Sequence, residues 1–276
     1  MPTTLVRLDR TVRIPYLGQF SAALERQLRA GTTLSITYWG SRGVSLFRSR
    51  DVNAPPPPDY SARPNPAIGV LRQIESSGHL ESNAMEVSFR GHLTRFFQGM
   101  IQYTLGQTYN DVPGNYAVST RGAGINAFPA DNYNLSGEWA RADYDARHRF
   151  NLLGSIHATK YFDFGVGLSM NSGVPYTETT GLDQYHTGYA NARPSGVPRN
   201  SLQGPGFVEL DVRWSHTFPL QHRNEGPRFA VGMDAFNITN RVNYVTYIGN
   251  LSSPFFGEPV AAKPPRRVQL SGRFEF

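Results

Sequence analysis

The chain has 276 residues, of which 39% are hydrophobic and 12% aromatic, and its formal net charge is +6. No run approaches the roughly 20 apolar residues of a membrane helix, which excludes a helical membrane protein. The 25 arginines and two lysines are scattered along the chain. Nucleic-acid binding usually needs a clustered basic surface, so nucleic acid is not expected as a partner. Cysteine is absent, which excludes disulfide and thiolate chemistry.

An alternation of apolar and polar residues recurs along the chain. In chain order it is weak at 18–28 and 32–40, clear at 84–93 and weak again at 96–106. Clear copies follow at 149–158, 161–170, 207–218, 228–236 and 266–276. A period of two predicts β-strands with one apolar and one polar face. At about 9 to 12 residues these strands match tilted membrane-spanning strands and exceed the globular average of roughly 5 to 6.

The connections between the predicted strands alternate in length. Short turns are expected at 28–33, 93–96, 158–161 and 219–226, and long loops at about 47–80, 110–144, 172–205 and 239–265. Repeated long loops argue against a compact soluble domain, whereas short turns on one side and long loops on the other are typical of an outer-membrane barrel. The pattern therefore favours an all-β antiparallel membrane barrel over a soluble two-sheet sandwich.

Several stretches of the chain carry a resemblance to a known family. They include YWGSRGVSLFRSRDVNAP, ADYDARHRFNL, RPSGVPRNSLQGPGFVELDVRWS and DAFNITNRVNY, together with the final strand RRVQLSGRFEF. In this order they resemble the C-terminal barrel region of Oar-like TonB-dependent outer-membrane receptors. This resemblance implies a barrel around a plug that contacts the TonB energy-transducing complex. No plug, TonB-contacting box or signal peptide is visible, so residues 1–276 are expected to be the C-terminal part of such a barrel.

The number of strands agrees with an incomplete barrel. Counting back from the last strand through alternating turns and loops gives nine spanning strands, with 68–78 placed in a hairpin outside the membrane. Bacterial single-chain barrels have even strand numbers. A count of nine indicates a barrel fragment, and a count of ten would leave a small autonomous porin as the alternative.

The resemblance also suggests roles for individual residues. A final strand that ends on phenylalanine resembles the signal read by the barrel-assembly machinery, which implies that role for Phe274 and Phe276. Aromatic girdles flank the apolar band of such barrels, and the expected members are Tyr161, Phe162, Trp214, Phe218 and Phe274. The alternation predicts that another set of charged side chains faces the lumen, namely Glu209, Asp211, Arg213, Arg267, Arg273 and Glu275.

No catalytic, metal-binding or cofactor-binding pattern emerges from the sequence. The seven histidines are dispersed, and no nucleophile elbow or zinc motif is present. Asp143, Asp145 and His148 could approach a metal ion, but charged residues at the mouth of a strand are the favoured interpretation. The chain is therefore expected not to be an enzyme and to need no cofactor.

These observations predict a receptor or transporter fragment in the bacterial outer membrane, which contributes to the energised uptake of an unidentified, scarce ligand. The expected partners are outer-membrane lipid, the barrel-assembly machinery and that ligand, with the TonB complex reached only through a plug. A passive porin and a soluble β-sandwich binding module are the alternative hypotheses.

Overall fold

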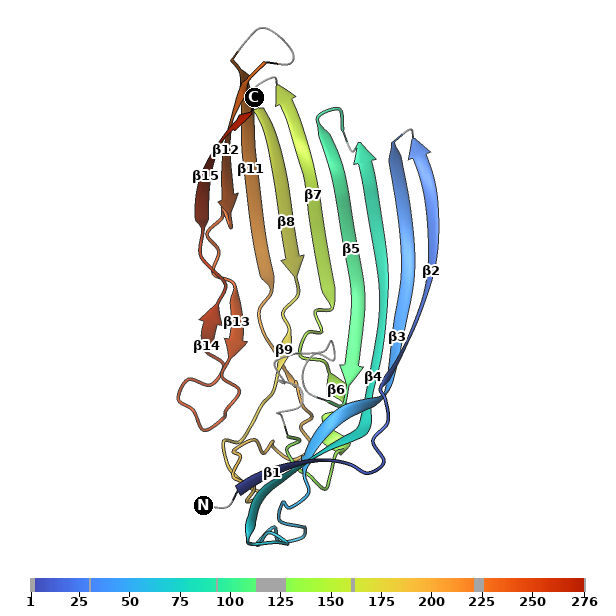
Figure 1. Ribbon diagram of the computed structural model, residues 1–276, viewed down its shortest axis with the longest axis vertical. Helices are drawn as coiled ribbons and strands as arrows, with labels where there is room; N and C mark the ends of the chain where they lie inside the picture. The colour runs from blue at the N-terminus through green and yellow to red at the C-terminus, as the bar shows by residue number, and fades with distance from the viewer. Residues whose placement is uncertain are drawn as a thin grey trace.

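The computed structural model describes residues 3–29, 31–92, 94–112, 128–159, 162–220 and 226–275. The main feature is one curved antiparallel sheet (Figure 1). Its consecutive neighbours, from one edge to the other, are β2 Tyr16–Arg29, β3 Thr32–Asp51, β4 Ile68–His92, β5 Phe97–Asn110, β7 His148–Thr159, β8 Phe162–Asn171, β11 Phe207–Pro219, β12 Arg228–Phe236 and β15 Arg267–Glu275. The predicted nine spanning strands are thus confirmed.

The shorter elements all lie toward the end of the sheet that carries the long loops, which we call the loop end (Figure 1). They are β1 Thr3–Leu8, the 3-10 helix η1 Ser136–Glu138, β6 Ala140–Arg141, β9 Pro175–Tyr176, β10 Leu202–Gln203, β13 Tyr244–Tyr247 and β14 Pro259–Ala262. The opposite end, with the short connections, is called the turn end. Among the described residues, no helix has the length and apolar character needed to cross a membrane.

The strand register separates the two faces of the sheet. One cross-strand row is apolar or aromatic throughout and runs through Leu24, Ile36, Val87, Tyr103, Phe150, Met170 and Val208. The neighbouring row is polar throughout and runs through Glu25, Ser35, Ser88, Gln102, Asn151, Ser169 and Glu209. Paired residues share a face and successive residues alternate, so the sheet has an apolar face and a polar face.

The sheet has very little buried hydrophobic core of its own. Among the residues that the structure describes, the cluster of buried apolar side chains consists of Leu46, Leu80 and Val112, at the loop end. Large apolar side chains on the apolar face, such as Leu24 and Leu270, are exposed by 72% and 76%. A sandwich would cover this face with a second sheet; here, in the described part of the chain, the nine long strands form a single sheet, which excludes the sandwich.

The β3–β4 hairpin is longer than the sequence predicted. The expected loop at 47–80 is partly strand, because β3 continues to Asp51 and β4 begins at Ile68. The part of this hairpin beyond Gly43 and Leu80, which we call the outer arm, bends across the loop end (Figure 1). Register shifts between Gly43 and Arg48 accompany the bend, as β-bulges commonly do. Residues 68–78 lie in this hairpin, beyond the part of β4 that pairs with β5, and their position outside the membrane stays a prediction.

The first strand makes a contact that the sequence did not indicate. β1 pairs in parallel with the outer arm, where Leu5 lies opposite Leu71 and Leu8 opposite Ile74. The backbone nitrogen of Arg13 also donates a hydrogen bond to the hydroxyl of Ser76 at 2.8 Å. The segment before β2 is therefore attached to β4 rather than to its neighbour in the sheet.

Candidate ligand-binding site among the loops

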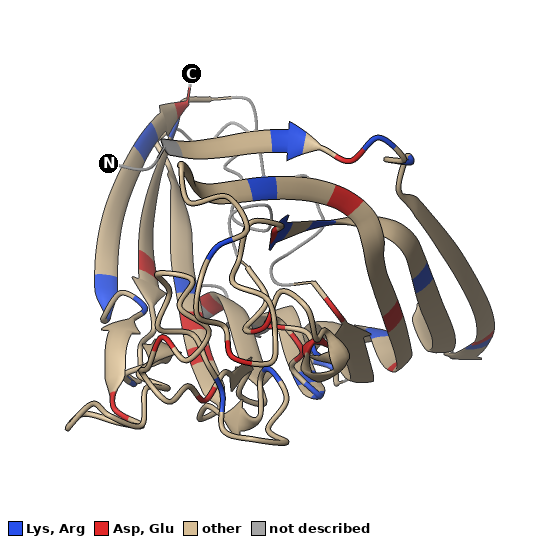
Figure 2. Ribbon diagram, turned by 90° about the horizontal axis from the view of Figure 1, so that it is seen from below, with Lys and Arg blue, Asp and Glu red and all other residues tan. Residues whose placement is uncertain are grey.

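Figure 2 shows many charged residues along the loops at the loop end. Three ion pairs involve the outer arm, with nitrogen–oxygen distances of 2.7 to 2.8 Å: Arg50 with Glu75 and Arg63 with Asp51 lie within this hairpin, and Arg48 joins it to Asp111 beyond the end of β5. The Asp51 side chain is only 1% exposed. A buried charge needs both a partner and hydrogen bonds, so these pairs restrict how the loops can be arranged.

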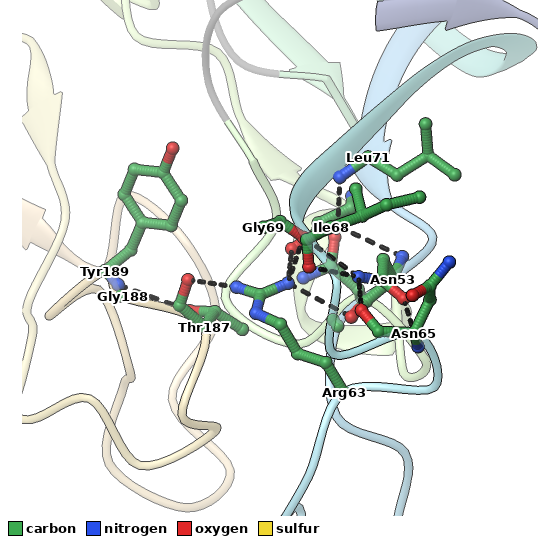
Figure 3. Close-up of polar contacts among 12 residues, drawn as sticks. Asn53, Arg63, Asn65, Ile68, Gly69, Leu71, Thr187, Gly188 and Tyr189 are labelled. Carbon is green, nitrogen blue, oxygen red and sulfur yellow. Dashed lines mark hydrogen bonds and ion pairs between the residues drawn. The ribbon is translucent and has the colours of Figure 1, made fainter. Parts of the chain in front are cut away.

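Arg63 is the centre of the best-connected group (Figure 3). Its Nη1 donates to Asp51 Oδ2 at 2.7 Å and to the carbonyl oxygens of Asn53 and Gly69 at 3.0 and 3.1 Å. Its Nη2 donates to the carbonyl oxygen of Thr187 at 2.7 Å. One guanidinium therefore closes loop 52–67 onto the outer arm and links both to loop 172–201.

The Asn53 side chain adds further hydrogen bonds to this arrangement. Its Nδ2 donates to the carbonyl oxygens of Asn65, Ile68 and Gly69 at 2.9 to 3.0 Å, and its Oδ1 accepts from the backbone of Asn65 at 2.9 Å. This buried side chain, at the start of the loop, thus satisfies backbone groups where the loop ends and β4 begins. The proline-rich segment 55–58 is held in place by its flanks.

A second charged group fastens loop 172–201 to the end of β5. Glu138 is almost fully buried and pairs with Arg193 at 2.7 Å, while Arg199 pairs with Asp143 at 2.8 Å. Arg199 also donates to the carbonyl oxygen of Asn110 at 2.9 Å. Burial lowers the pKa of the Arg199 guanidinium, and the nearby Asp143 and Glu138 oppose that shift.

A cavity of about 380 Å³ lies between these loop segments. Its lining is mainly polar and includes Asp131, Asn134, Ser136, Tyr185, Arg193 and Ser195. Ligand pockets in proteins commonly enclose roughly 300 to 1,000 Å³. The cavity therefore has the size and the hydrogen-bonding groups to hold a small polar molecule.

Tyr60 supports one wall of this cavity from the outer-arm loop. Its hydroxyl donates to Asp131 Oδ2 at 2.9 Å, and its ring meets that of Tyr185 edge to face, with the ring centres 4.9 Å apart. Burial, together with the hydrogen bond to Asp131, raises the pKa of Tyr60 to about 12. The hydroxyl therefore remains protonated, and a donor to Asp131, throughout the physiological range.

The residues considered for a metal site each have a separate partner. Asp143 pairs with Arg199, Asp145 pairs with Arg141 at 2.7 Å, and His148 contacts the Tyr103 hydroxyl at 2.7 Å. No group of three or more His, Asp or Glu side chains in the described ranges is arranged to hold a metal ion. These contacts fit the interpretation of charged residues at a strand mouth.

The predicted aromatic residues lie toward the turn end. Phe274 is paired with Phe229, which is paired on its other side with Phe218. Trp214 lies between Phe164 and Met233 on the same apolar face. Tyr161 and Phe276 fall outside the described residues, and Phe162 opens β8. The girdle and assembly roles stay predictions.

The predicted lumen residues lie on the polar face, although they do not form one cluster. Arg213 lies 3.6 Å from Asp234, and Arg273 lies 3.0 Å from Glu275. Asp211 accepts a hydrogen bond from the backbone of Asn237 at 2.8 Å. Arg267 lies over the ring of Phe236, and Glu209 is paired with Ser169. Their exposure to a lumen is a prediction.

A second group of aromatic residues was missed from the sequence. Phe20, Tyr38 and Tyr103 lie on the apolar face in the half of the sheet nearer the loops, and the Phe20 and Tyr38 rings are 6.1 Å apart. The Tyr38 hydroxyl donates to Asn83 Oδ1 at 3.0 Å. The alternation at 18–28, 32–40 and 96–106 could have located them, since all three belong to its apolar set.

The fold is similar to that of three solved outer-membrane proteins at low sequence identity. The outer membrane transporter YddB from Escherichia coli gives a TM-score of 0.65 at 12% identity, over 98% of this chain and 34% of that one. The FrpB iron transporter from Neisseria meningitidis gives 0.54 at 8% identity, over 97% and 32%. FpvA of P. aeruginosa, solved with heterologous pyoverdines, gives 0.51 at 12% identity, over 94% and 27%. The chain thus spans about a third of their length or less. Comparison with curated proteins finds no significant match.

Long antiparallel strands with an apolar outer face, short turns at one end and long loops at the other define a membrane β-barrel sheet. The sequence matches the outer membrane beta barrel domain family over residues 1–198 and 172–269, and the chain belongs to that family. It is an outer-membrane protein whose fold matches part of the fold of the outer membrane transporter YddB. The proteins of similar fold are transporters and receptors rather than enzymes.

Proposed function

We propose that residues 1–276 form the C-terminal part of the barrel of a TonB-dependent receptor that imports a scarce ligand with energy from the inner membrane. The observation that carries the proposal is the fold similarity to YddB, which extends over 98% of this chain but only 34% of that transporter. A chain that matches one third of a transporter, and matches it almost completely, is best explained as a portion of the same architecture.

The arrangement of the loops supports ligand capture at the outer surface. The ion pairs of Arg63, Arg193 and Arg199 hold three loop segments around the polar cavity. A rigid set of loops loses little conformational entropy when a ligand binds. The ligand would enter among these loops and continue along the polar face of the sheet. A plug and its contact with the TonB complex would belong to parts of the receptor outside this chain.

The other expected partners follow from the two faces and the last strand. The apolar face contacts membrane lipid, because its exposed side chains have no cover from the described part of the chain. The strand that carries Phe274 would present the C-terminal signal to the barrel-assembly machinery. No enzymatic activity and no cofactor are part of the proposal.

The test of uptake compares a deletion strain with a strain that produces the protein. Compounds removed from a complex medium are identified by mass spectrometry, with and without a protonophore that collapses the inner-membrane gradient. We expect at least one compound to be removed only by the producing strain and only while the gradient is present. Protonophore-resistant passage, together with ion conductance of the purified protein in a planar bilayer, would establish a passive porin instead.

A variant pair connects this uptake to the loop cavity. Ser195→Trp places a large ring in the cavity lining, whereas Ser201→Trp adds the same ring at an exposed loop position outside it. We expect the first variant to lower uptake at limiting ligand concentration and the second to leave it unchanged. Equal uptake by both variants would show that the ligand does not pass through this cavity.

A further inference from the structure

A second groove lies on the apolar face, which contacts lipid, and is separate from the loop cavity. It encloses about 270 Å³ and has a mainly apolar floor that includes Tyr38, Met85 and Leu105. These three residues form one cross-strand row on β3, β4 and β5. Their side chains are exposed by 38 to 45%, so the protein itself leaves this floor open.

The edge of the groove nearer the loops is polar. One of its side chains is hydrogen-bonded within the protein, and two others have donors that no described residue engages. Asn83 is already engaged, because its Oδ1 accepts from the Tyr38 hydroxyl at 3.0 Å and its Nδ2 donates to Glu81 at 3.2 Å. Gln107 and Arg147 also line the groove. In the part of the chain that the structure describes, neither of these two side chains has a hydrogen-bond or ion-pair partner.

The position of this edge matches the boundary of the bilayer. Gln107 lies ten residues beyond Phe97, where β5 begins at the turn end. A strand rises about 3.3 Å per residue, and a tilt of about 40° leaves about 2.5 Å of height per residue. Gln107 is therefore about 25 Å above the turn end, which is close to the height of the apolar band of outer-membrane barrels, about 25 Å.

We propose that this groove binds one membrane lipid with an anionic phosphate headgroup. The acyl chain lies over Met85 and Leu105, while the Arg147 guanidinium and the Gln107 amide donate hydrogen bonds to the phosphate. This partner fits because a guanidinium and an amide offer donors to an anion directly above an apolar floor. A basic side chain at a membrane surface contributes to the binding of anionic lipid in this way.

Among the charged residues near the groove, Arg147 carries a positive charge that no acidic side chain of the described residues compensates. Arg42 is paired with Glu81 at 3.0 Å and also lies 6.0 Å from the centre of the Phe20 ring. This pair is neutral overall. The charge of Arg147 has no such counterpart among the described residues, which favours an anionic over a zwitterionic headgroup. The proposal goes beyond ligand uptake, since the lipid would occupy the outside of the sheet.

The test measures lipid binding to the full-length protein extracted from outer membranes in a mild detergent. The probes are phosphatidylglycerol and phosphatidylcholine with identical acyl chains, and bound lipid is counted by native mass spectrometry. One basic residue near a membrane surface contributes about 1 kcal/mol, so we expect about fivefold tighter binding of phosphatidylglycerol. Arg147→Gln should abolish that preference, and Arg147→Lys should retain most of it.

Arg149→Gln is the matched control, because Arg149 is paired with Thr104 on the polar face and donates to the carbonyl oxygen of Tyr144 at 3.1 Å, whereas Arg147 precedes the first residue of β7 and lines the groove. This variant should keep the preference for phosphatidylglycerol. An unchanged preference in Arg147→Gln, or an equal loss in Arg149→Gln, would overturn the proposal. Displacement of the lipid by inorganic phosphate alone would also overturn it, because the headgroup rather than the lipid would then be the ligand.

Discussion

The spanning sheet and the loop end are stabilised in different ways. In the sheet, one cross-strand row is entirely apolar and the next entirely polar, and in the described part of the chain the buried hydrophobic cluster comprises three residues at the loop end. At the loop end, buried charges such as Asp51 and Glu138 are matched by arginines from distant segments. The stability of the sheet therefore depends on the membrane around its apolar face, whereas the stability of the loops depends on individual ion pairs. A substitution should be tolerated or rejected according to the region in which it falls.

Loss of a loop partner should give the largest effect. Arg63→Met leaves the Asp51 carboxylate buried without its cation, and breaking a buried pair in this way costs about 3 to 5 kcal/mol. Hydrogen exchange should show lost protection in loop 52–67 and around Thr187, while the spanning strands stay protected. Arg266→Met, at an exposed position, is the control and should leave the exchange pattern unchanged. Protection retained in Arg63→Met would contradict the assigned role.

A charge placed on the apolar face of the sheet should give the second-largest loss of stability. Val212 lies on the apolar face and Arg213 on the polar face of the same strand. Val212→Arg should lower the free energy of unfolding by about 2 to 4 kcal/mol near the bilayer midplane, and Arg213→Val should cost much less. Urea unfolding in lipid vesicles, followed by tryptophan fluorescence, measures both. Equal costs for the two variants would show that the faces are assigned incorrectly.

A smaller effect is expected where two strands approach closely at the turn end. Gly91 has a φ of +133°, and a Cβ there would meet the carbonyl oxygen of Gly31 and the Cα of Thr32. Gly91→Ala should destabilise the protein by about 1 to 3 kcal/mol in the same unfolding experiment. Gly165→Ala is the control, since its nearest neighbour would be 3.5 Å away. A similar result for both variants would mean that the β3–β4 contact can relax.

The smallest effect concerns the pH dependence of the loop cavity. Because the pKa of Tyr60 is raised to about 12 in the folded protein, against roughly 10 for an exposed tyrosine, the folded state holds this proton more tightly. The associated stability is complete below pH of about 10 and is lost as the pH rises toward about 12. Ultraviolet titration of tyrosinate should show one late step that Tyr60→Phe removes. A titration without a late step in the unmodified protein would refute this assignment.

The sheet could be predicted because each strand carries its own local signal. The alternation from Val208 to Phe218, for example, already separates the two faces, and nine such segments account for the nine spanning strands. The loop end could not be predicted in the same way. Arg63 meets a carbonyl that lies 124 residues further along the chain, and β1 pairs with the outer arm across more than 60 residues. Neither partner is marked by a periodic pattern, so three-dimensional packing alone brings them together.

The order of the strands also limits what can complete the barrel. Every step along the path from β2 to β15 is antiparallel, so the two edge strands point in the same direction through the membrane. If the sheet closed on itself, or if several copies inserted in one orientation joined edge to edge, each new junction would be parallel. An antiparallel barrel that contains this sheet therefore needs an odd number of additional strands between β15 and β2.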